Sequence, residues 1–291
     1  MAIIQPVITG GGTTPTGTLP ITNNGTYDVT NYASADVNVP TTAPALYREF
    51  RLDANGVLQP NTTTTHIINF TGVTDIDGYI LAKTYYQNTA ISGVVNMSAL
   101  TTISGNYACI QMFQGCTGLT GANMSALTTI SGNSACSYMF YSCDGLTSVD
   151  LSALTTISGG SACSSMFGGC TGLTSADLPA LTTISGTSSC SSMFGGCTGL
   201  TSANLSSLTT ISSFSACSYM FRGCTSLATV YIGNTTAINF GGNTDVFANM
   251  FRDCTQNIDV YAPAASQTQI EAFSGYPNFS GTGTVTWHWR S

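Results

Sequence analysis

A 27-residue repeat runs through the middle of the chain and limits what the chain can fold into. Five units open with the same residues, Leu-Thr-Thr-Ile-Ser, and they begin at Leu100, Leu127, Leu154, Leu181 and Leu208. Apolar residues recur at fixed places in every unit, so each unit has one apolar side that it cannot bury alone. Units of this kind must stack, and stacking predicts an elongated solenoid with a continuous core.

The unit that begins at Leu181 predicts two elements. Four apolar residues follow the i, i+3, i+4, i+7 spacing of one helix face, which predicts a two-turn helix; they are Cys190, Met193, Phe194 and Cys197. Residues 200–205 then alternate as a short strand, with Ala203 and Leu205 pointing inward. The predicted fold class is an α/β repeat solenoid with a parallel β-sheet face. Its core is expected to include Cys163, Met166, Phe167, Cys170, Cys190, Met193, Phe194 and Cys197.

Divergent units are expected at both ends of the array, which we place at residues 66–262. Subtracting 27 maps Leu100 and Ile103 onto Val73 and Ile76, and it maps Met112 and Phe113 onto Tyr85 and Tyr86. The first strand is expected at 66–70. Met250, Phe251 and Cys254 predict a last helix, and 258–261 predicts a last strand, so that about eight strands form the sheet.

The chain has 11 cysteines, and their spacing assigns them to the repeat. They form two series with a 27-residue period, one from Cys109 to Cys217 and one from Cys116 to Cys224, and Cys254 follows. On the predicted helix the two series lie two turns apart, too far for a disulfide within a unit or for a shared metal ion. We expect reduced, buried thiols that fill the core, and no cofactor.

Charge is scarce and excludes several function classes. Charged residues make up 7% of the chain and the net charge is −7, so neither nucleic acid nor a membrane is an expected partner. No base is available for a Cys or Ser nucleophile, because His66 and His288 lie at opposite ends of the array; we expect no enzyme. Asp150 and Asp177 occupy equivalent outward strand positions, where they either bind a cation or belong to a solvated polar face.

Large side chains interrupt otherwise small, polar columns of the repeat. Exposed aromatic and arginine side chains on a rigid scaffold commonly anchor a glycan or a protein partner. The candidate ligand-binding residues are Tyr107, Tyr138, Tyr141, Tyr219, Arg222 and Tyr231. Contacts between subunits, or incidental exposure, would account for the same pattern.

The sequence MFGGCTGLTSADLPALTTISG, at 166–186, is similar to the leucine-rich repeats of the BspA type. Such repeats are common in surface antigens of gut and oral bacteria and in their phages. The segment 260–273 resembles the closing unit of that family, in which a Pro-Ala-Ser segment leads into a capping helix. The resemblance implies a leucine-rich-repeat array of 27-residue units, and it implies binding or adhesion without catalysis.

The region before the array predicts an attachment function. A Gly/Thr-rich arm (1–20) precedes a small β-module with its linker (21–45) and a β-hairpin segment (46–65), and residues 263–291 form a C-terminal cap. Residues 21–39 resemble a β-module of phage structural proteins, and the start lacks the pattern of a secretion signal.

These features predict a virion fibre or decoration protein. In that interpretation the N-terminal region binds other virion proteins and a homo-oligomer, most plausibly a trimer, displays the repeats for host-surface or glycan binding. The alternative is a bacterial cell-surface adhesin with the same repeats.

Overall fold

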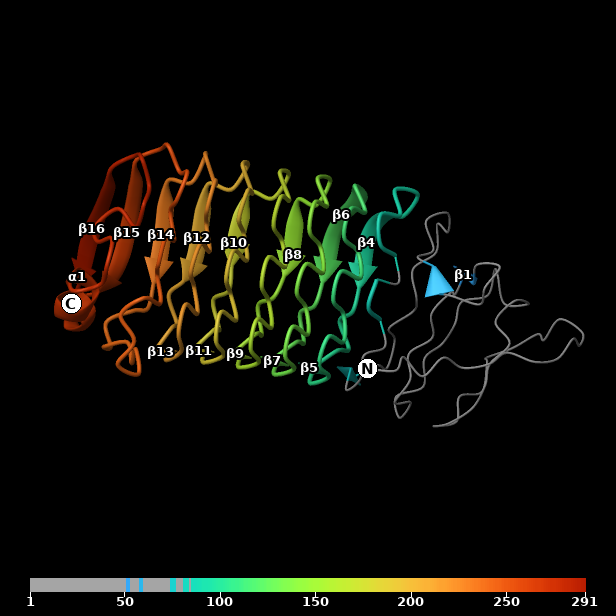
Figure 1. Ribbon diagram of the computed structural model, residues 1–291, viewed down its shortest axis with the longest axis horizontal. Coiled ribbons are helices and arrows are strands. Elements are labelled where there is room, and N and C mark those ends of the chain that lie inside the picture. Colours follow the sequence, from blue (N-terminus) through green and yellow to red (C-terminus); the bar gives the residue numbers. More distant parts are fainter. Residues whose placement is uncertain (1–50, 53–57, 60–73, 77–80, 84) are drawn as a thin grey trace, which may run out of the picture.

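The computed structural model describes residues 51–52, 58–59, 74–76, 81–83 and 85–291. From residue 74 onward the chain winds into stacked coils whose strands run parallel to their equivalents in the next coil (Figure 1). The predicted repeat solenoid is therefore confirmed. Before it, β1 (Arg51–Leu52) pairs antiparallel with β2 (Leu58–Gln59), inside the stretch expected to form a hairpin. The predicted arm, the β-module and the strand at 66–70 lie outside the described residues.

One side of each coil carries the longer strands, and we call it the sheet side. Its strands are β4 (Ser92–Asn96), β6 (Gly118–Asn123), β8 (Ser148–Asp150), β10 (Ser175–Asp177), β12 (Ser202–Leu205), β14 (Thr229–Ile232), β15 (Ile258–Pro263) and β16 (Val285–Arg290). Ala203 and Leu205 are buried, as predicted. The strand at 258–261 was expected to be the last, and this was wrong, because β16 pairs with it along six positions.

A second row of strands, which the sequence did not predict, is formed by the Thr-Ile of the repeated motif and, in the first coil, by Asp-Ile. The row comprises β3 (Asp75–Ile76), β5 (Thr102–Ile103), β7 (Thr129–Ile130), β9 (Thr156–Ile157), β11 (Thr183–Ile184) and β13 (Thr210–Ile211). Each isoleucine is buried. From β5 to β13 the threonine before each strand donates its hydroxyl hydrogen to the carbonyl one coil earlier, as Thr155 does to Thr128 at 3.0 Å. The motif thus supplies both a core residue and a bond between coils.

The third side of each coil, here called the turn side, is not the helix that the spacing predicted. Alternate backbone N–H groups donate to carbonyls of the next coil, as Phe167 N does to Met193 O at 2.9 Å. The N–H groups between them donate to the carbonyl three residues earlier in the same coil, as Met166 N does to Cys163 O at 3.1 Å. Every fourth residue has a positive φ, as in Ser161, Ser165 and Gly169. The helices expected at 190–197 and 250–254 are therefore absent, because inter-coil bonds replace the bonds within a helix.

The core contains one aromatic column. The rings of Phe113, Phe140, Phe167, Phe194, Phe221 and Phe251 stack with centroids 5.3–6.2 Å apart. Tyr85 continues the column on Phe113 at 5.3 Å, so Tyr85 and not Tyr86 is the equivalent of Phe113. The register is irregular between Gly93 and Val94, and from Val94, which pairs with Gly121, the 27-residue offset holds. Ile76 pairs with Ile103, as the repeat predicted.

All eleven cysteines are buried free thiols in this core. The series from Cys116 to Cys254 donates to backbone carbonyls of the preceding coil, as Cys170 Sγ does to Phe140 O at 3.0 Å. In the series from Cys109 to Cys217 the described structure records no thiol bonded to a backbone carbonyl, and only Cys190 has a polar side-chain neighbour, the hydroxyl of Ser189. We call these the bonded and the unbonded cysteine columns. Among the described residues, no three or more His, Cys, Asp or Glu side chains gather where they could hold a metal ion.

Two short helices close the array after β15. A 3-10 turn, η1 (Ala264–Ser266), leads into α1 (Gln267–Glu271), where the Pro-Ala-Ser segment predicted a capping helix. Ile270 of α1 and Phe273 just after it are buried against the core. No helix among the described residues combines the length and apolar character that a membrane crossing requires.

Candidate functional site

Five of the six predicted ligand-binding residues lie on the turn side. Tyr107 and Tyr138 are 47% and 39% exposed, Tyr141 and Tyr219 are half-buried, and Arg222 is exposed. Tyr138 and Tyr219 stand in one column of equivalent positions, with Ser165 and Ser192 between them. The turn side therefore presents two groups of large side chains separated by coils whose residues are small. We call this surface the tyrosine face.

Three of these tyrosines occupy a backbone conformation that bulky residues rarely adopt. The φ angles of Tyr107, Tyr138 and Tyr219 are +58°, +56° and +56°. Most equivalent positions in other coils carry serine, for example Ser165 with a φ of +51°. A non-glycine residue in this region raises the conformational energy by about 1–2 kcal/mol, and residues under such strain cluster at functional sites.

Neighbouring contacts fix the large side chains. The rings of Tyr138 and Tyr141 meet edge to face at 5.5 Å and 61°. The guanidinium of Arg252 lies 6.0 Å from the centroid of the Tyr219 ring, and Arg222 Nε lies 2.9 Å from an Asp253 oxygen. The Arg222–Asp253 pair is solvent-exposed, so it orients the side chains and contributes little to stability.

Tyr231, the sixth candidate, lies on β14 of the sheet side and is separate from the tyrosine face. Its ring stacks on Tyr261 at 5.0 Å, and Tyr261 stacks on His288 at 4.6 Å. His288 Nε2 lies 2.8 Å from an Asp259 oxygen. Arg290 lies over the Tyr231 ring and donates to the carbonyl of Gly233.

Sequence reasoning missed Tyr261 and His288 as neighbours of Tyr231. Their pairing follows from β15 and β16, which place the three residues opposite one another in register. The sequence placed Tyr261 outward on the predicted strand 258–261, so its pairing with Tyr231 could have been predicted. The pairing with His288 could not, because β16 was not expected to join the sheet.

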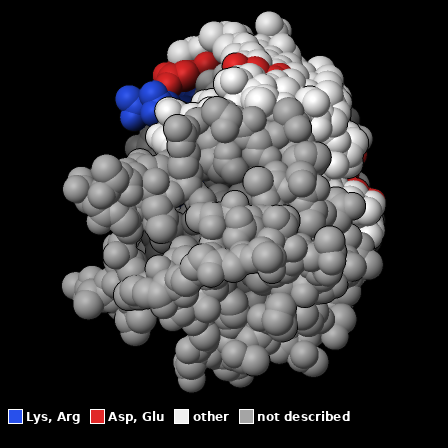
Figure 2. Space-filling view, turned by 90° about the vertical axis from the view of Figure 1, so that its right-hand side faces the viewer, with Lys and Arg blue, Asp and Glu red and all other residues white. Residues whose placement is uncertain are grey.

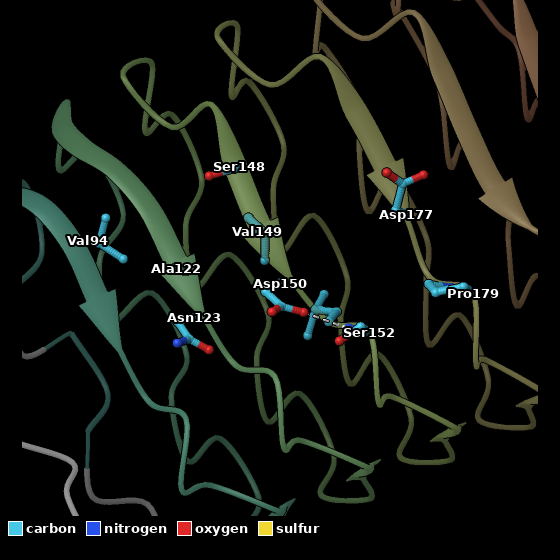
Figure 3. Close-up of a pocket in the computed structure, with 10 residues that line it drawn as sticks. Val94, Ala122, Asn123, Ser148, Val149, Asp150, Ser152, Asp177 and Pro179 are labelled. Atoms are coloured by element: carbon cyan, nitrogen blue, oxygen red, sulfur yellow. Dashed lines mark hydrogen bonds between the residues drawn. The ribbon is translucent and has the colours of Figure 1, made fainter.

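Asp150 and Asp177 lie beside a shallow pocket of about 430 Å³ on the sheet side (Figure 3). Here the sheet is interrupted, because β8 and β10 are not hydrogen-bonded as a pair. Two carboxylates directly opposite on neighbouring strands repel, which accounts for an opening at this place. Val149 is only half-buried at the opening, although it stands at an inward position.

The two carboxylates differ in their local bonding. Asp150 Oδ1 accepts the N–H of Ser152 at 3.0 Å, as the amide oxygens of equivalent asparagines do in other coils. Pro179 stands two residues after Asp177 and has no N–H to donate. The structure brings the two aspartates to one pocket, and among the described residues no third His, Cys, Asp or Glu side chain joins them there.

The surface around these sites carries few charges. Figure 2 looks onto the end at which the described chain begins, and most of the described surface visible there is neither acidic nor basic. Between Lys83 and Arg222 the sequence contains no basic residue, while Asp144, Asp150 and Asp177 fall in that stretch. The middle coils therefore favour uncharged or cationic ligands over anions.

Comparison with known proteins identifies the repeat. The model of the BspA type leucine rich repeat region matches residues 78–217 and 133–278, with six copies. A leucine-rich repeat protein from Bacteroides ovatus ATCC 8483 is 14% identical, with 73% of this chain and 88% of that chain covered and a TM-score of 0.20.

A leucine rich cell surface protein from Faecalibacterium prausnitzii A2-165 is 13% identical, with 82% and 92% covered and a TM-score of 0.20. None of the curated proteins matches the chain. The two matched ranges of the family model overlap and together take in more than half of the 291 residues. The chain therefore belongs to the BspA type leucine-rich-repeat family.

Proposed function

We propose that this protein is a non-catalytic recognition module of a bacterial cell surface and that it binds its ligand through the tyrosine face. The observation that carries the proposal is the gathering of Tyr107, Tyr138, Tyr141, Tyr219 and Arg222 on one side of a rigid solenoid. Three of these tyrosines are kept at positive φ, where serine would serve the fold equally well. Because serine takes the same φ in the other coils, the fold does not call for an aromatic side chain at these places, and exposed aromatic side chains on a rigid scaffold commonly contact a partner.

The location at a cell surface rests on the family, whose repeats are common in bacterial surface antigens. The first expectation, a virion fibre or decoration protein with a trimeric attachment region, depends on residues 21–39. That segment lies outside the described residues, and neither the family match nor the structural neighbours add support for a phage particle. The adhesin is therefore the function that we propose.

The test compares adhesion of the full chain and of a variant that carries Tyr107→Ser, Tyr138→Ser, Tyr141→Gly and Tyr219→Ser. Each replacement is a residue that another coil has at the equivalent position, so the fold should persist. We expect beads coated with the variant to bind mucus-covered epithelial cells at least about tenfold more weakly. A matched control, Tyr231→Asn on the sheet side, should bind normally. Equal binding by the two variants would exclude the tyrosine face.

A further inference from the structure

In one column of the tyrosine face, long side chains give way to glycine in two successive coils and then return. The successive residues of this column are Gln114, Tyr141, Gly168, Gly195 and Arg222. Two coils without a side chain thus lie between a tyrosine and an arginine. The two glycines have different surroundings, and the difference indicates what the gap is for.

Gly168 is required by the packing of Tyr141. A Cβ atom at position 168 would lie 2.8 Å from Tyr141 Cδ2 and 2.9 Å from Cε2, closer than carbon atoms pack. The ring of Tyr141 therefore extends over the neighbouring coil and occupies the space above Gly168. Its edge-to-face contact with Tyr138 supports the ring from the side. Tyr141 is a preorganised platform and not a freely rotating side chain.

Gly195 has no such requirement. Its backbone is outside the positive-φ region, whereas the next residue, Gly196, has a φ of +75° that favours glycine. A Cβ atom at position 195 would meet only Ser192 and the backbone oxygen of Arg222, at 3.3–3.7 Å. Gln114, Tyr141 and Arg222 show that the same column accepts long side chains. Neither backbone nor packing explains the glycine, so the space above it is open for a ligand.

We propose that the space above Gly195 is a subsite for one uncharged sugar residue, which packs an apolar C–H face against Tyr141 and directs its hydroxyls toward Ser192 and Arg222. This inference rests on the proposed function and names its ligand class. Coils are spaced by about 4.8 Å, so an opening between the overhanging Tyr141 and Arg222 suits one ring. Small-molecule sites combine aromatic walls with a few polar groups in this way.

The electrostatics select a neutral sugar. Arg222 is already paired with Asp253 at 2.9 Å, so its charge is balanced and its remaining N–H groups are available as hydrogen-bond donors. Arg252, in the next coil, lies over the Tyr219 ring, and no basic residue lies between 83 and 222, so the coils on the N-terminal side of the subsite disfavour sulfated and acidic glycans. A peptide is disfavoured because alternate backbone N–H groups of the turn side already bond to the next coil, as Phe194 N does to Met220 O.

The experiment measures binding of neutral tetrasaccharides of glucose, galactose, mannose and N-acetylglucosamine, and of a sulfated galactose tetrasaccharide, to the full chain by titration calorimetry. At least one neutral probe should bind, and the sulfated probe should bind more weakly. Tyr141→Ser should reduce the affinity at least tenfold. Gly195→Gln, which puts into this coil the residue that Gln114 provides in the same column ahead of another long side chain, should block binding while thermal melting stays unchanged.

The matched control is Tyr231→Asn on the sheet side, apart from the tyrosine face, which should keep the affinity within about twofold. The inference is overturned if Gly195→Gln and Tyr141→Ser both bind like the parent chain, or if the sulfated probe binds best. It is also overturned, with the proposed function intact, if the parent chain adheres equally to intact and to enzymatically deglycosylated cells. If the parent chain does not adhere to intact cells at all, the proposed function itself is contradicted.

Discussion

At the scale of single residues, the core contains both polar groups that have hydrogen-bond partners and polar groups that lack them. The thiol of Cys170 donates to Phe140 O, whereas Cys163, seven residues earlier, belongs to the unbonded column. A serine hydroxyl at position 170 retains an acceptor, but at position 163 it would be buried without one. An unsatisfied buried hydroxyl costs about 1–3 kcal/mol.

Cys163→Ser should therefore destabilise the array by at least about 1 kcal/mol more than Cys170→Ser. Urea denaturation of the two variants measures the difference, and both remove similar volume, so cavity effects largely cancel. A larger loss for Cys170→Ser would show that the thiol-to-carbonyl bonds, and not burial, determine the ranking.

Ser189 is a second residue of this kind. Its hydroxyl is fully buried, and in the described structure its one polar neighbour is the sulfur of Cys190, a weak hydrogen-bonding group. The equivalent residues in neighbouring coils, Ala162 and Ala216, are buried alanines. Ser189→Ala should stabilise the protein by about 1 kcal/mol, and the reverse change, Ala162→Ser, should destabilise it. Thermal melting of both variants checks the pair, and a lower melting temperature for Ser189→Ala would mean that the hydroxyl has a partner.

At the scale of elements, the sequence predicted the strand of each unit but assigned the turn side to a helix. The spacing of Cys190, Met193, Phe194 and Cys197 is that of a helix face, and the turn side buries the same four positions by another backbone path. A separate signal was present in the residues with positive φ, such as Ser188, Ser192 and Gly196. Small residues at every fourth place tolerate that conformation, but apolar spacing alone contains no information about φ.

The candidate site was predicted only in part, for a related reason. The repeat alignment placed Tyr138 and Tyr219 in one column correctly, because equivalent positions stack whatever the backbone path. The overhang of Tyr141 above Gly168 depends on a side-chain direction, and a sequence pattern does not specify that direction. The one-residue shift of Tyr85 was also out of reach, because the 27-residue register holds only from Val94 onward.

Ser142 provides a test of the turn side. It has a φ of +54°, and the equivalent residues in the next three coils are Gly169, Gly196 and Gly223, with φ of +73°, +75° and +68°. Ser142→Gly should raise stability by up to about 1 kcal/mol, since relief of left-handed strain exceeds the added entropy of glycine. Gly169→Ser should lower stability by a similar amount. Chemical denaturation measures both changes in the free energy of unfolding. A loss of stability in Ser142→Gly, or a gain in Gly169→Ser, would contradict the expected cost of a side chain at positive φ.

At the scale of the whole molecule, stability is a sum over coils and their interfaces. Phe194 stacks on Phe167 and on Phe221, whereas Phe251 stacks only on Phe221 among the described rings. Phe194→Ala should cost about 3–5 kcal/mol, and Phe251→Ala should cost less because one interface is damaged instead of two. Thermal melts of the two variants compare them. Equal losses would mean that the coils do not behave as a nearest-neighbour stack.

Alkaline pH should unfold the array through its thiols. Burial raises the pKa of Cys109 and of Cys197 from 9.0 to about 12. Because the pKa is higher in the folded state, the stabilising contribution is complete below pH 9 and is lost as pH rises from 9 toward 12. Each fully buried thiol should lose about 1.4 kcal/mol per pH unit in that range.

The urea midpoint should therefore fall steeply between pH 8.5 and roughly pH 10.5. The decrease of the urea midpoint with pH should be less steep in a variant with Cys109→Ala, Cys136→Ala and Cys163→Ala, which has fewer thiols to ionise. Tyrosine ionisation is common to both proteins, so the comparison isolates the cysteines. Identical slopes would show that the thiols do not govern the alkaline limit.

Hydrogen bonds join one coil to the next on all three sides, except on the sheet side between β8 and β10, and they make neighbouring coils interchangeable. Thr155 bonds to Thr128 as Thr182 bonds to Thr155, and Cys170 bonds to Phe140 as Cys197 bonds to Phe167. Removing one 27-residue unit would bring together surfaces that already fit, and duplicating one would do the same. In-frame exchange between repeats can therefore lengthen or shorten this protein in steps of about 4.8 Å, which moves the sugar-binding coils toward or away from the N-terminal region without a new core having to evolve.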